Sequence, residues 1–153
     1  MEIFLSMDKK IVIASDHGGF GLKEEIKNFL SNLDYEVLDL GTNSRESCDY
    51  PNFAKEVSRK IQEGSFKQGI LVCGTGLGMQ IAANKFKGIR AVCVSDTFSA
   101  KMSKEHNNSN VLCIGERVLG LGLAKEIVTT WLNSEFQGER HQKRLDLISA
   151  FEE

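Results

Sequence analysis

The segment from Ile70 to Gly78 joins a short apolar run, a cysteine and three alternating glycines. A helical pattern follows from Met79 to Lys85. This order predicts a buried strand, a tight loop and the beginning of a helix. Backbone N–H groups in such a loop favour negative charge, so they can stabilise the thiolate of Cys73 and hold a small oxyanion. Cys73 is therefore a candidate base or nucleophile beside an anion-binding loop.

The glycines of this loop, Gly74, Gly76 and Gly78, do not complete a G-x-G-x-x-G fingerprint, because Met79 occupies the last position. The chain also lacks a G-x-x-x-x-G-K-[ST] motif. Both absences argue against a dinucleotide or nucleoside triphosphate site. A nucleotide-binding regulatory module is nevertheless kept as the alternative function, from a class other than enzymes.

All three histidines lie in polar clusters rather than in apolar runs. His17 follows Asp16 at the end of a predicted strand, His106 ends a predicted helix, and His141 begins the last one. His17 lies where a predicted strand ends, and His106 and His141 could fold onto the same edge of the sheet. An unperturbed imidazole titrates near pH ~6.5, so His106 is a candidate acid or base. A histidine is also favoured at a helix C-terminus by the helix dipole, which is the alternative role for His106.

Arg140 and Arg144 are four residues apart on the last predicted helix and so share one face. Their mutual repulsion, and their position in the first half of the helix, are both unfavourable. A bound anion would offset both costs, and two guanidinium groups suit a phosphate dianion. The alternative is a solvated basic face with Glu139 and Asp146 as partners.

Apolar runs and helical patterns alternate along the chain. The predicted strands are Lys10–Ser15, Glu36–Leu40, Gly69–Cys73, Arg90–Val94 and Val111–Ile114, and the predicted helices are Leu22–Leu33, Phe53–Ile61, Leu77–Phe86, Thr97–Glu105, Val118–Leu132 and Glu139–Phe151. This order predicts a Rossmann-like, doubly wound α/β domain, with a five-stranded parallel sheet, helices on both faces and a C-terminal helix. Ligands bind beyond the carboxyl ends of such strands, so we expect residues 16–19, 73–78, 95–96 and 115–117 to form one rim.

The length of 153 residues suits one domain, which we assign to residues 9–153, with residues 1–8 as an N-terminal extension. The net charge of −2 gives no general attraction to nucleic acid or to an anionic membrane surface. No apolar stretch approaches the ~20 residues of a membrane span. The four cysteines form no C-x-x-C pair, which argues against a zinc ribbon. Free thiols suggest a reducing compartment, so we expect a cytoplasmic protein.

Six motifs, taken in their order and spacing, resemble ribose-5-phosphate isomerase type B, in the wider group that includes the galactose-6-phosphate isomerase subunits. They are Ser15-Asp16-His17-Gly18-Gly19, Asp49-Tyr50-Pro51, Cys73-Gly74-Thr75-Gly76-Leu77-Gly78, Ile81-Ala82-Ala83-Asn84-Lys85, Glu105-His106-Asn107 and Gly138-Glu139-Arg140-His141-Gln142. The resemblance covers roughly Lys9 to Phe151. It implies an enzyme that interconverts ribose 5-phosphate and ribulose 5-phosphate with no metal and no other cofactor.

The resemblance also implies residue roles. Cys73 would move a proton between C1 and C2 through an enediolate, whereas some members use a glutamate at the position of Met79. His106 would assist furanose ring opening, and Thr75 lies in the loop that would hold the enediolate oxygen. The implied substrate contacts are Asp16, His17, Gly74, Thr75, Gly76, Leu77, Gly78, Asn107, Arg117, Arg140 and Arg144. Family members are homodimers, sometimes assembled into tetramers, whose sites combine residues of both subunits. A hexose 6-phosphate, such as allose or galactose 6-phosphate, is the alternative substrate.

Overall fold

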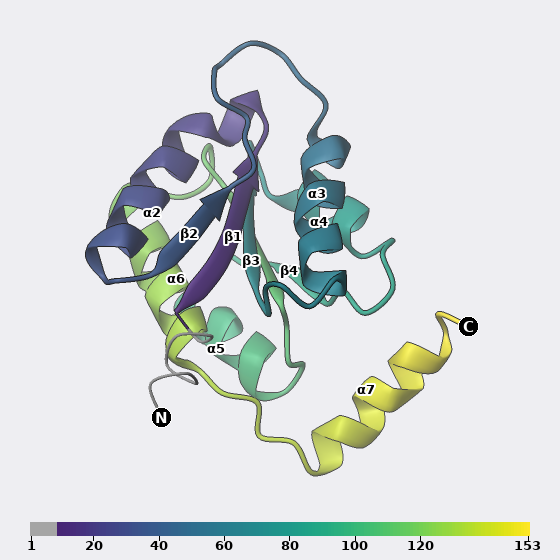
Figure 1. Ribbon diagram of the computed structural model, residues 1–153. Helices are drawn as coiled ribbons and strands as arrows, with labels where there is room; N and C mark the ends of the chain where they lie inside the picture. The colour runs from purple at the N-terminus through teal and green to yellow at the C-terminus, as the bar shows by residue number, and fades with distance from the viewer. Residues whose placement is uncertain (1–8) are drawn as a thin grey trace.

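The computed structural model describes residues 9–153. Its centre is a parallel sheet with the strand order β2-β1-β3-β5-β4 (Figure 1). The strands are β1 (Lys10–Ser15), β2 (Glu36–Asp39), β3 (Gly69–Cys73), β4 (Ala91–Cys93) and β5 (Val111–Gly115). This sheet confirms the expected Rossmann-like fold. Residues 1–8, predicted to be an N-terminal extension, lie outside the described residues.

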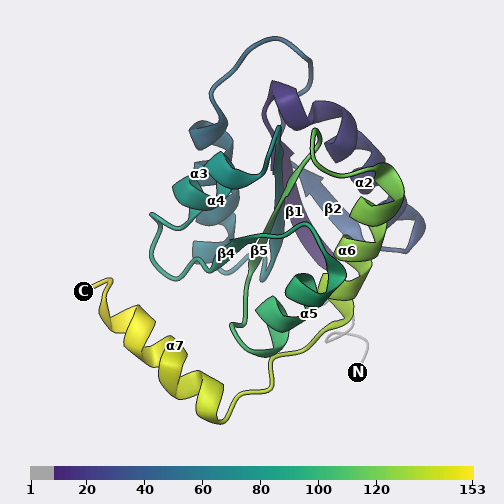
Figure 2. The same ribbon diagram turned by 180° about the vertical axis from the view of Figure 1, so that it is seen from behind.

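Helices cover both faces of the sheet (Figures 1 and 2). One layer contains α2 (Phe20–Asn32), α5 (Thr97–Glu105) and α6 (Leu121–Asn133), and the other contains α3 (Tyr50–Gln62) and α4 (Leu77–Ala83). The last helix, α7 (Arg140–Ala150), stands apart from both layers. Among residues 9–153, no helix combines the length and the apolar character needed to cross a membrane.

The apolar runs form the centre of the sheet because helices cover both of its faces. Successive side chains of a strand point to opposite faces. In β1, Ile11 and Ile13 pack into the layer of α2 and α6, whereas Val12 and Ala14 pack into the layer of α3 and α4. All four are fully buried. The core on both sides therefore fixes the position at which each strand ends.

The predicted bounds of the elements differ from the observed bounds by at most three residues. The start of α6 illustrates the reason, because the helix begins at Leu121 rather than at Val118. The N–H groups of Val118 and Leu119 both donate to the carbonyl of Gly115. The residues after β5 thus form a turn across the end of the sheet before the helix begins.

Candidate active site

The predicted rim lies at a switch point of the sheet. β1 and β3 are neighbours, but the chain leaves β1 toward α2 in one layer and leaves β3 toward α4 in the other. In doubly wound sheets, ligands bind beyond the carboxyl ends of the strands at such a point. Residues 16–19 and 73–78 lie at the ends of β1 and β3 there, as the sequence predicts.

Asp16 shapes the first of these loops. Its Oδ1 accepts the N–H groups of Gly18, at 2.9 Å, and Gly19, at 3.1 Å. A Cβ at Gly19 would lie 2.6 Å from the carbonyl carbon of Val72, so only glycine allows this turn to approach β3. A Cβ at Gly18 would lie 3.4 Å from the backbone nitrogen of Gly74. The turn that contains Asp16 and His17 is therefore packed directly against the cysteine loop.

Cys73 is the last residue of β3, and its side chain is turned to the glycine loop. The N–H of Gly76 donates to its Sγ at 3.0 Å, and the residue is 5% exposed. Gly76 has a φ of +84°, in the region that favours glycine. A Cβ at Gly76 would lie 2.8 Å from the Sγ of Cys93. The loop thus folds back over the sulfur and holds one N–H against it.

Two further cysteines lie in the sheet. Burial raises the pKa of the Cys93 thiol and raises that of Cys113, which is fully buried, well above its usual value. Cys113 is a core residue. Cys93 is only partly buried and lines a cavity of about 270 Å³ with Thr75 and Ser95. The raised pKa values keep both groups protonated at neutral pH.

Thr75 and Arg117 complete the rim. The Oγ1 of Thr75 accepts the N–H of Leu77 at 3.2 Å, which orders the loop where α4 begins. The N–H of Arg117 donates to the carbonyl of Gly74 at 3.0 Å. A Cβ at Gly74 would lie within 3.6 Å of three atoms of the Arg117 side chain. The exposed guanidinium of Arg117 therefore belongs to the same site as the glycine loop.

His17 lies on the β1 side of the rim, where the loop before α3 contacts it. The backbone N–H of Cys48 donates to its Nδ1 at 3.2 Å, and the Sγ of Cys48 lies 3.9 Å from the same nitrogen. An imidazole nitrogen that accepts a hydrogen bond carries no proton. Neutral His17 therefore has its proton on Nε2, which is available as a donor.

His106 and Asn107 lie at the opposite edge of the sheet. α5 begins after the carboxyl end of β4, and its nine residues cover about 13 Å before β5 starts. Asn110 marks that edge, because its carbonyl accepts the N–H of Gly69 at the start of β3. The expectation that His106 folds onto the rim is therefore wrong within one chain.

His141 accompanies His106 at that edge. The two rings stack with centroids 4.2 Å apart and planes 14° apart. Burial lowers the pKa of His141, and the nearby His106, Arg140 and Arg144 lower it further. Both arginines are exposed, and among residues 9–153 neither forms an ion pair. Asp146, the partner expected for a solvated basic face, instead accepts a hydrogen bond from Gln142.

A cavity of about 790 Å³ also lies at this edge, but it is not assembled from the predicted residues. Its cationic lining includes Lys9, Lys67, Arg90 and Lys104. Lys9 donates to the carbonyl of Leu33 at the end of α2. Cations are favoured at the ends of helices where carbonyl groups are unpaired. Lys9 therefore has a structural role at the end of α2.

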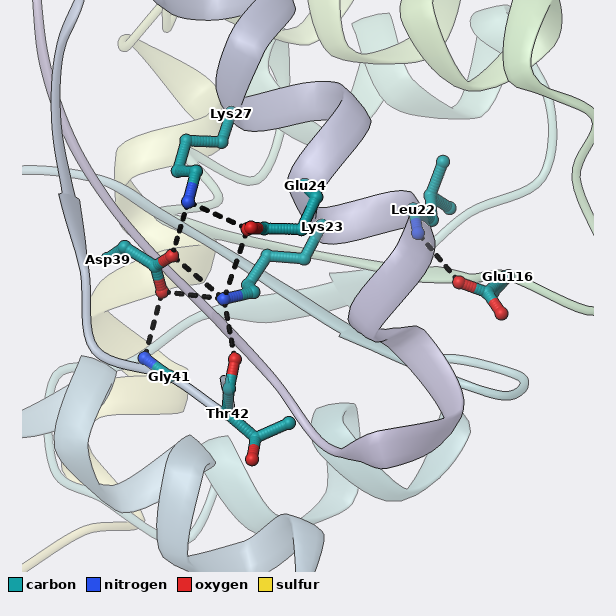
Figure 3. A network of polar contacts seen from close by, with 8 residues as sticks. All are labelled: Leu22, Lys23, Glu24, Lys27, Asp39, Gly41, Thr42 and Glu116. Carbon is teal, nitrogen blue, oxygen red and sulfur yellow. Dashed lines mark hydrogen bonds and ion pairs between the residues drawn. The ribbon is translucent and has the colours of Figure 1, made fainter. Parts of the chain in front are cut away.

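Sequence reasoning missed several contacts of the rim. The Tyr50 ring covers Gly78, where a Cβ would lie 2.6 Å from it, and Glu116 accepts the N–H of Leu22 at 2.6 Å. Tyr50 was part of a resemblance motif without an assigned role. A fully buried lysine, Lys23, pairs with the partly buried Asp39 and anchors the loop that reaches His17 (Figure 3). The only sequence signal for this pair is a lysine beside the apolar stripe of a helix.

Known proteins support the resemblance. Residues 11–148 match the model of the family described as Ribose/Galactose Isomerase. The chain is 50% identical over 145 residues to ribose-5-phosphate isomerase B of Escherichia coli K12, which covers 95% of this chain and 97% of that protein. Two solved structures are similar along nearly all of both chains. Ribose-5-phosphate isomerase B of Clostridium thermocellum has a TM-score of 0.93 and 52% identity, with 94% of this chain and 97% of that chain covered.

The second structure, that of the enzyme from Mycoplasma genitalium with bound ribulose-5-phosphate, has a TM-score of 0.90 and 41% identity, and covers 94% of this chain and 95% of that chain. Fold and sequence identity agree across these relatives. On this evidence the chain belongs to the Ribose/Galactose Isomerase family.

Proposed function

We propose that this protein interconverts ribose 5-phosphate and ribulose 5-phosphate, with Cys73 as the base. The observation that carries the proposal is the position of the Cys73 sulfur at the carboxyl end of β3, under the glycine loop and beside the N–H of Gly76. A relative with this fold binds ribulose-5-phosphate, the proposed product. The position at which some family members carry a glutamate is Met79 in this chain, and it is fully buried. No carboxylate therefore competes with Cys73 as the base at that position.

The proposed chemistry is a proton transfer next to a carbonyl group. The thiolate of Cys73 removes the proton on C2 of the open-chain aldose, and the electron pair forms the C1–C2 double bond while O1 takes up negative charge. The proton returns to C1, a proton passes from O2 to O1, and the ketose results. Backbone N–H groups of residues 74–78, with Thr75, stabilise the oxyanion while it exists. These steps use only groups of this chain and need no additional cofactor.

We infer that a second copy of the chain completes the site. His106, the proposed acid and base for ring opening, lies with Asn107 at the opposite edge of the sheet from Cys73 in its own chain. Arg140 and Arg144 lie near His141, which stacks on His106. In a dimer with two-fold symmetry, the rim of each copy can face the His106 edge of the other. Two complete sites result from one interface. The arginine pair then binds the phosphate, while Cys73 acts at the other end of the sugar.

The exposed apolar side chains fit such an interface. Leu77 and Ile81 on α4 are 54% and 63% exposed, and Phe98 at the start of α5 is 71% exposed. Ile148 on α7 and Phe151, which follows that helix, are exposed as well. Exposed apolar groups that gather on one surface mark interaction sites. A homodimer is therefore the smallest assembly that we expect, and a tetramer of such dimers preserves the same sites.

The location in the cytoplasm stays a prediction. All four cysteines are free thiols in the structure. Free thiols persist in reducing compartments. The free thiols of this chain are what we expect of a protein in that compartment.

A substrate comparison tests the proposed function. The purified protein is incubated with ribose 5-phosphate, allose 6-phosphate and galactose 6-phosphate, and kcat/KM is compared. We expect the highest value for the pentose, with exchange of the C2 proton in deuterated water. A higher value for a hexose would reassign the substrate within the same chemistry. Nucleotide binding without isomerisation or exchange would instead support a regulatory module.

A further inference from the structure

The side chain of Lys23 is charged and completely buried at the start of α2. Lysine is rarely found fully buried unless it is paired. Its Nζ donates to both carboxylate oxygens of Asp39 and to the carbonyl of Thr42, each at 2.8 Å (Figure 3). The three donors of the ammonium group thus have three acceptors. The pair joins α2 to the end of β2 and to the residues that follow it.

These contacts hold the beginning of a loop. Residues 40–49 connect β2 to α3 without regular secondary structure and extend beyond the carboxyl edge of the sheet (Figure 1). Lys23 binds the carbonyl of Thr42, and Asp39 accepts the N–H of Gly41 at 2.8 Å. One ion pair therefore fixes both a donor and an acceptor in the first part of this loop.

The other end of the loop reaches the rim. Six residues after Thr42, the N–H of Cys48 donates to Nδ1 of His17. Between them, Arg45 pairs with Glu116 at 3.4 Å, and Glu116 accepts the N–H of Leu22. The arginine is largely exposed, so this surface pair holds the loop weakly. The Lys23–Asp39 pair at the beginning of the loop, with its lysine fully buried, is the stronger anchor.

We propose that Lys23 is a positioning residue, which together with Asp39 fixes loop 40–49 so that the Cys48 N–H keeps the His17 proton on Nε2, directed to the substrate. The proposal rests on the proposed function, in which His17 contacts the sugar phosphate. A donor that is displaced or has the wrong tautomer loses a contact to bound substrate, so the effect is expected in KM rather than in kcat.

Neighbouring charges in the same network provide a matched control. Lys27 contacts the same Asp39 carboxylate at 3.0 Å and Glu24 at 2.7 Å, but neither of these contacts involves the loop. Lys27→Met removes an ion pair of Asp39 but none of the groups that Lys23 contacts, which are Asp39, Thr42 and the Glu24 carboxylate at 3.5 Å. A general effect of charge loss in this network would appear equally in Lys27→Met and Lys23→Met.

The test combines ¹⁵N NMR of the histidine side chains with steady-state kinetics on ribose 5-phosphate. In the wild type we expect His17 with its proton on Nε2 at neutral pH. Lys23→Met is expected to give a mixture of tautomers and to raise KM about ten-fold or more with kcat changed less than about three-fold. Lys27→Met is expected to match the wild type in both measurements. Asp39→Asn retains an acceptor for Gly41 but removes the charge facing Lys23, and it decides the question if Lys23→Met does not fold.

Opposite results would overturn the proposal. One such result is a wild-type His17 with its proton on Nδ1. Another is a folded Lys23→Met or Asp39→Asn variant whose His17 tautomer and KM equal those of Lys27→Met. A rise in KM with an unchanged His17 tautomer would also contradict the assigned route. If the wild type isomerises no sugar phosphate, the proposed function fails, while the NMR comparison of the variants still decides whether Lys23 positions His17.

Discussion

The rim and the His106 edge are built in different ways. At the rim, Asp16 and Cys73 are buried, and their side chains accept hydrogen bonds from backbone N–H groups of the same chain. At the other edge, Arg140 and Arg144 are exposed on a helix that stands apart from the sheet. The rim is therefore organised by the fold of one chain. The other edge has its charged groups exposed, and contacts within the chain do not fix them in the same way.

The largest expected effect concerns the rim. Cys73→Ala removes the proposed base and is expected to lower kcat about 10³-fold or more, because proton transfer loses its acceptor. The thermal unfolding temperature is expected to change little. Cys93→Ala is the matched control, since it removes a thiol next to the same loop. A Cys73→Ala variant with substantial activity, or equal losses in both variants, would remove Cys73 from the chemistry.

The next effect concerns the other edge. His106→Asn is expected to lower turnover of cyclic ribose 5-phosphate about 10²-fold, because ring opening loses its acid and base. An open-chain analogue needs no ring opening, so its turnover is expected to fall much less. The measurement is kcat for both substrates with the same variant. Equal losses would contradict a role in ring opening.

The arginine pair is expected to act on binding alone. Arg144→Ala removes a charge-assisted hydrogen bond to phosphate and is expected to raise KM about ten-fold or more with kcat little changed. Lys143→Ala removes a charge from the neighbouring position and serves as the control. Steady-state kinetics on ribose 5-phosphate measure both. An unchanged KM in Arg144→Ala would favour a solvated basic face.

The smallest effect is the pH dependence of stability. Because the folded protein lowers the pKa of His141, the unfolded chain binds more protons as the pH falls through about 6.5. The free energy of unfolding is therefore expected to decrease on acidification below that pH. His141→Phe keeps a ring against His106 and is expected to weaken this dependence. Denaturant unfolding between pH 5 and 8 measures it, and an equal slope in both proteins would contradict the assignment.

The fold and the rim were predictable because their determinants are local in sequence. The apolar runs of β1 and β3, with Asp16 directly after the first and Cys73 at the end of the second, mark strand ends that meet at one edge of a parallel sheet. The glycine loop was identified for the same reason. The start of α6 was misplaced because the turn at Gly115 depends on backbone contacts across the sheet.

The residues of the His106 edge entered the predicted site only through the family resemblance. His106 and Cys73 are parts of the same resemblance, yet the topology separates them, and no pattern within a sequence shows how copies associate. The contact between Cys48 and His17 uses a backbone N–H, which leaves no trace in residue types. Lys23 lies beside an apolar stripe, and only the packing of β2 against α2 shows that its partner is Asp39.

The central claim is that each complete site takes Cys73 from one chain and His106 from another. Cys73→Ala and His106→Asn chains are each nearly inactive in this account. When equal amounts are unfolded, mixed and refolded together, half of the dimers are mixed, and one of the two sites in each is intact. The account predicts recovery of about a quarter of the wild-type activity on ribose 5-phosphate. A mixture no more active than the separate variants would contradict a site shared between chains.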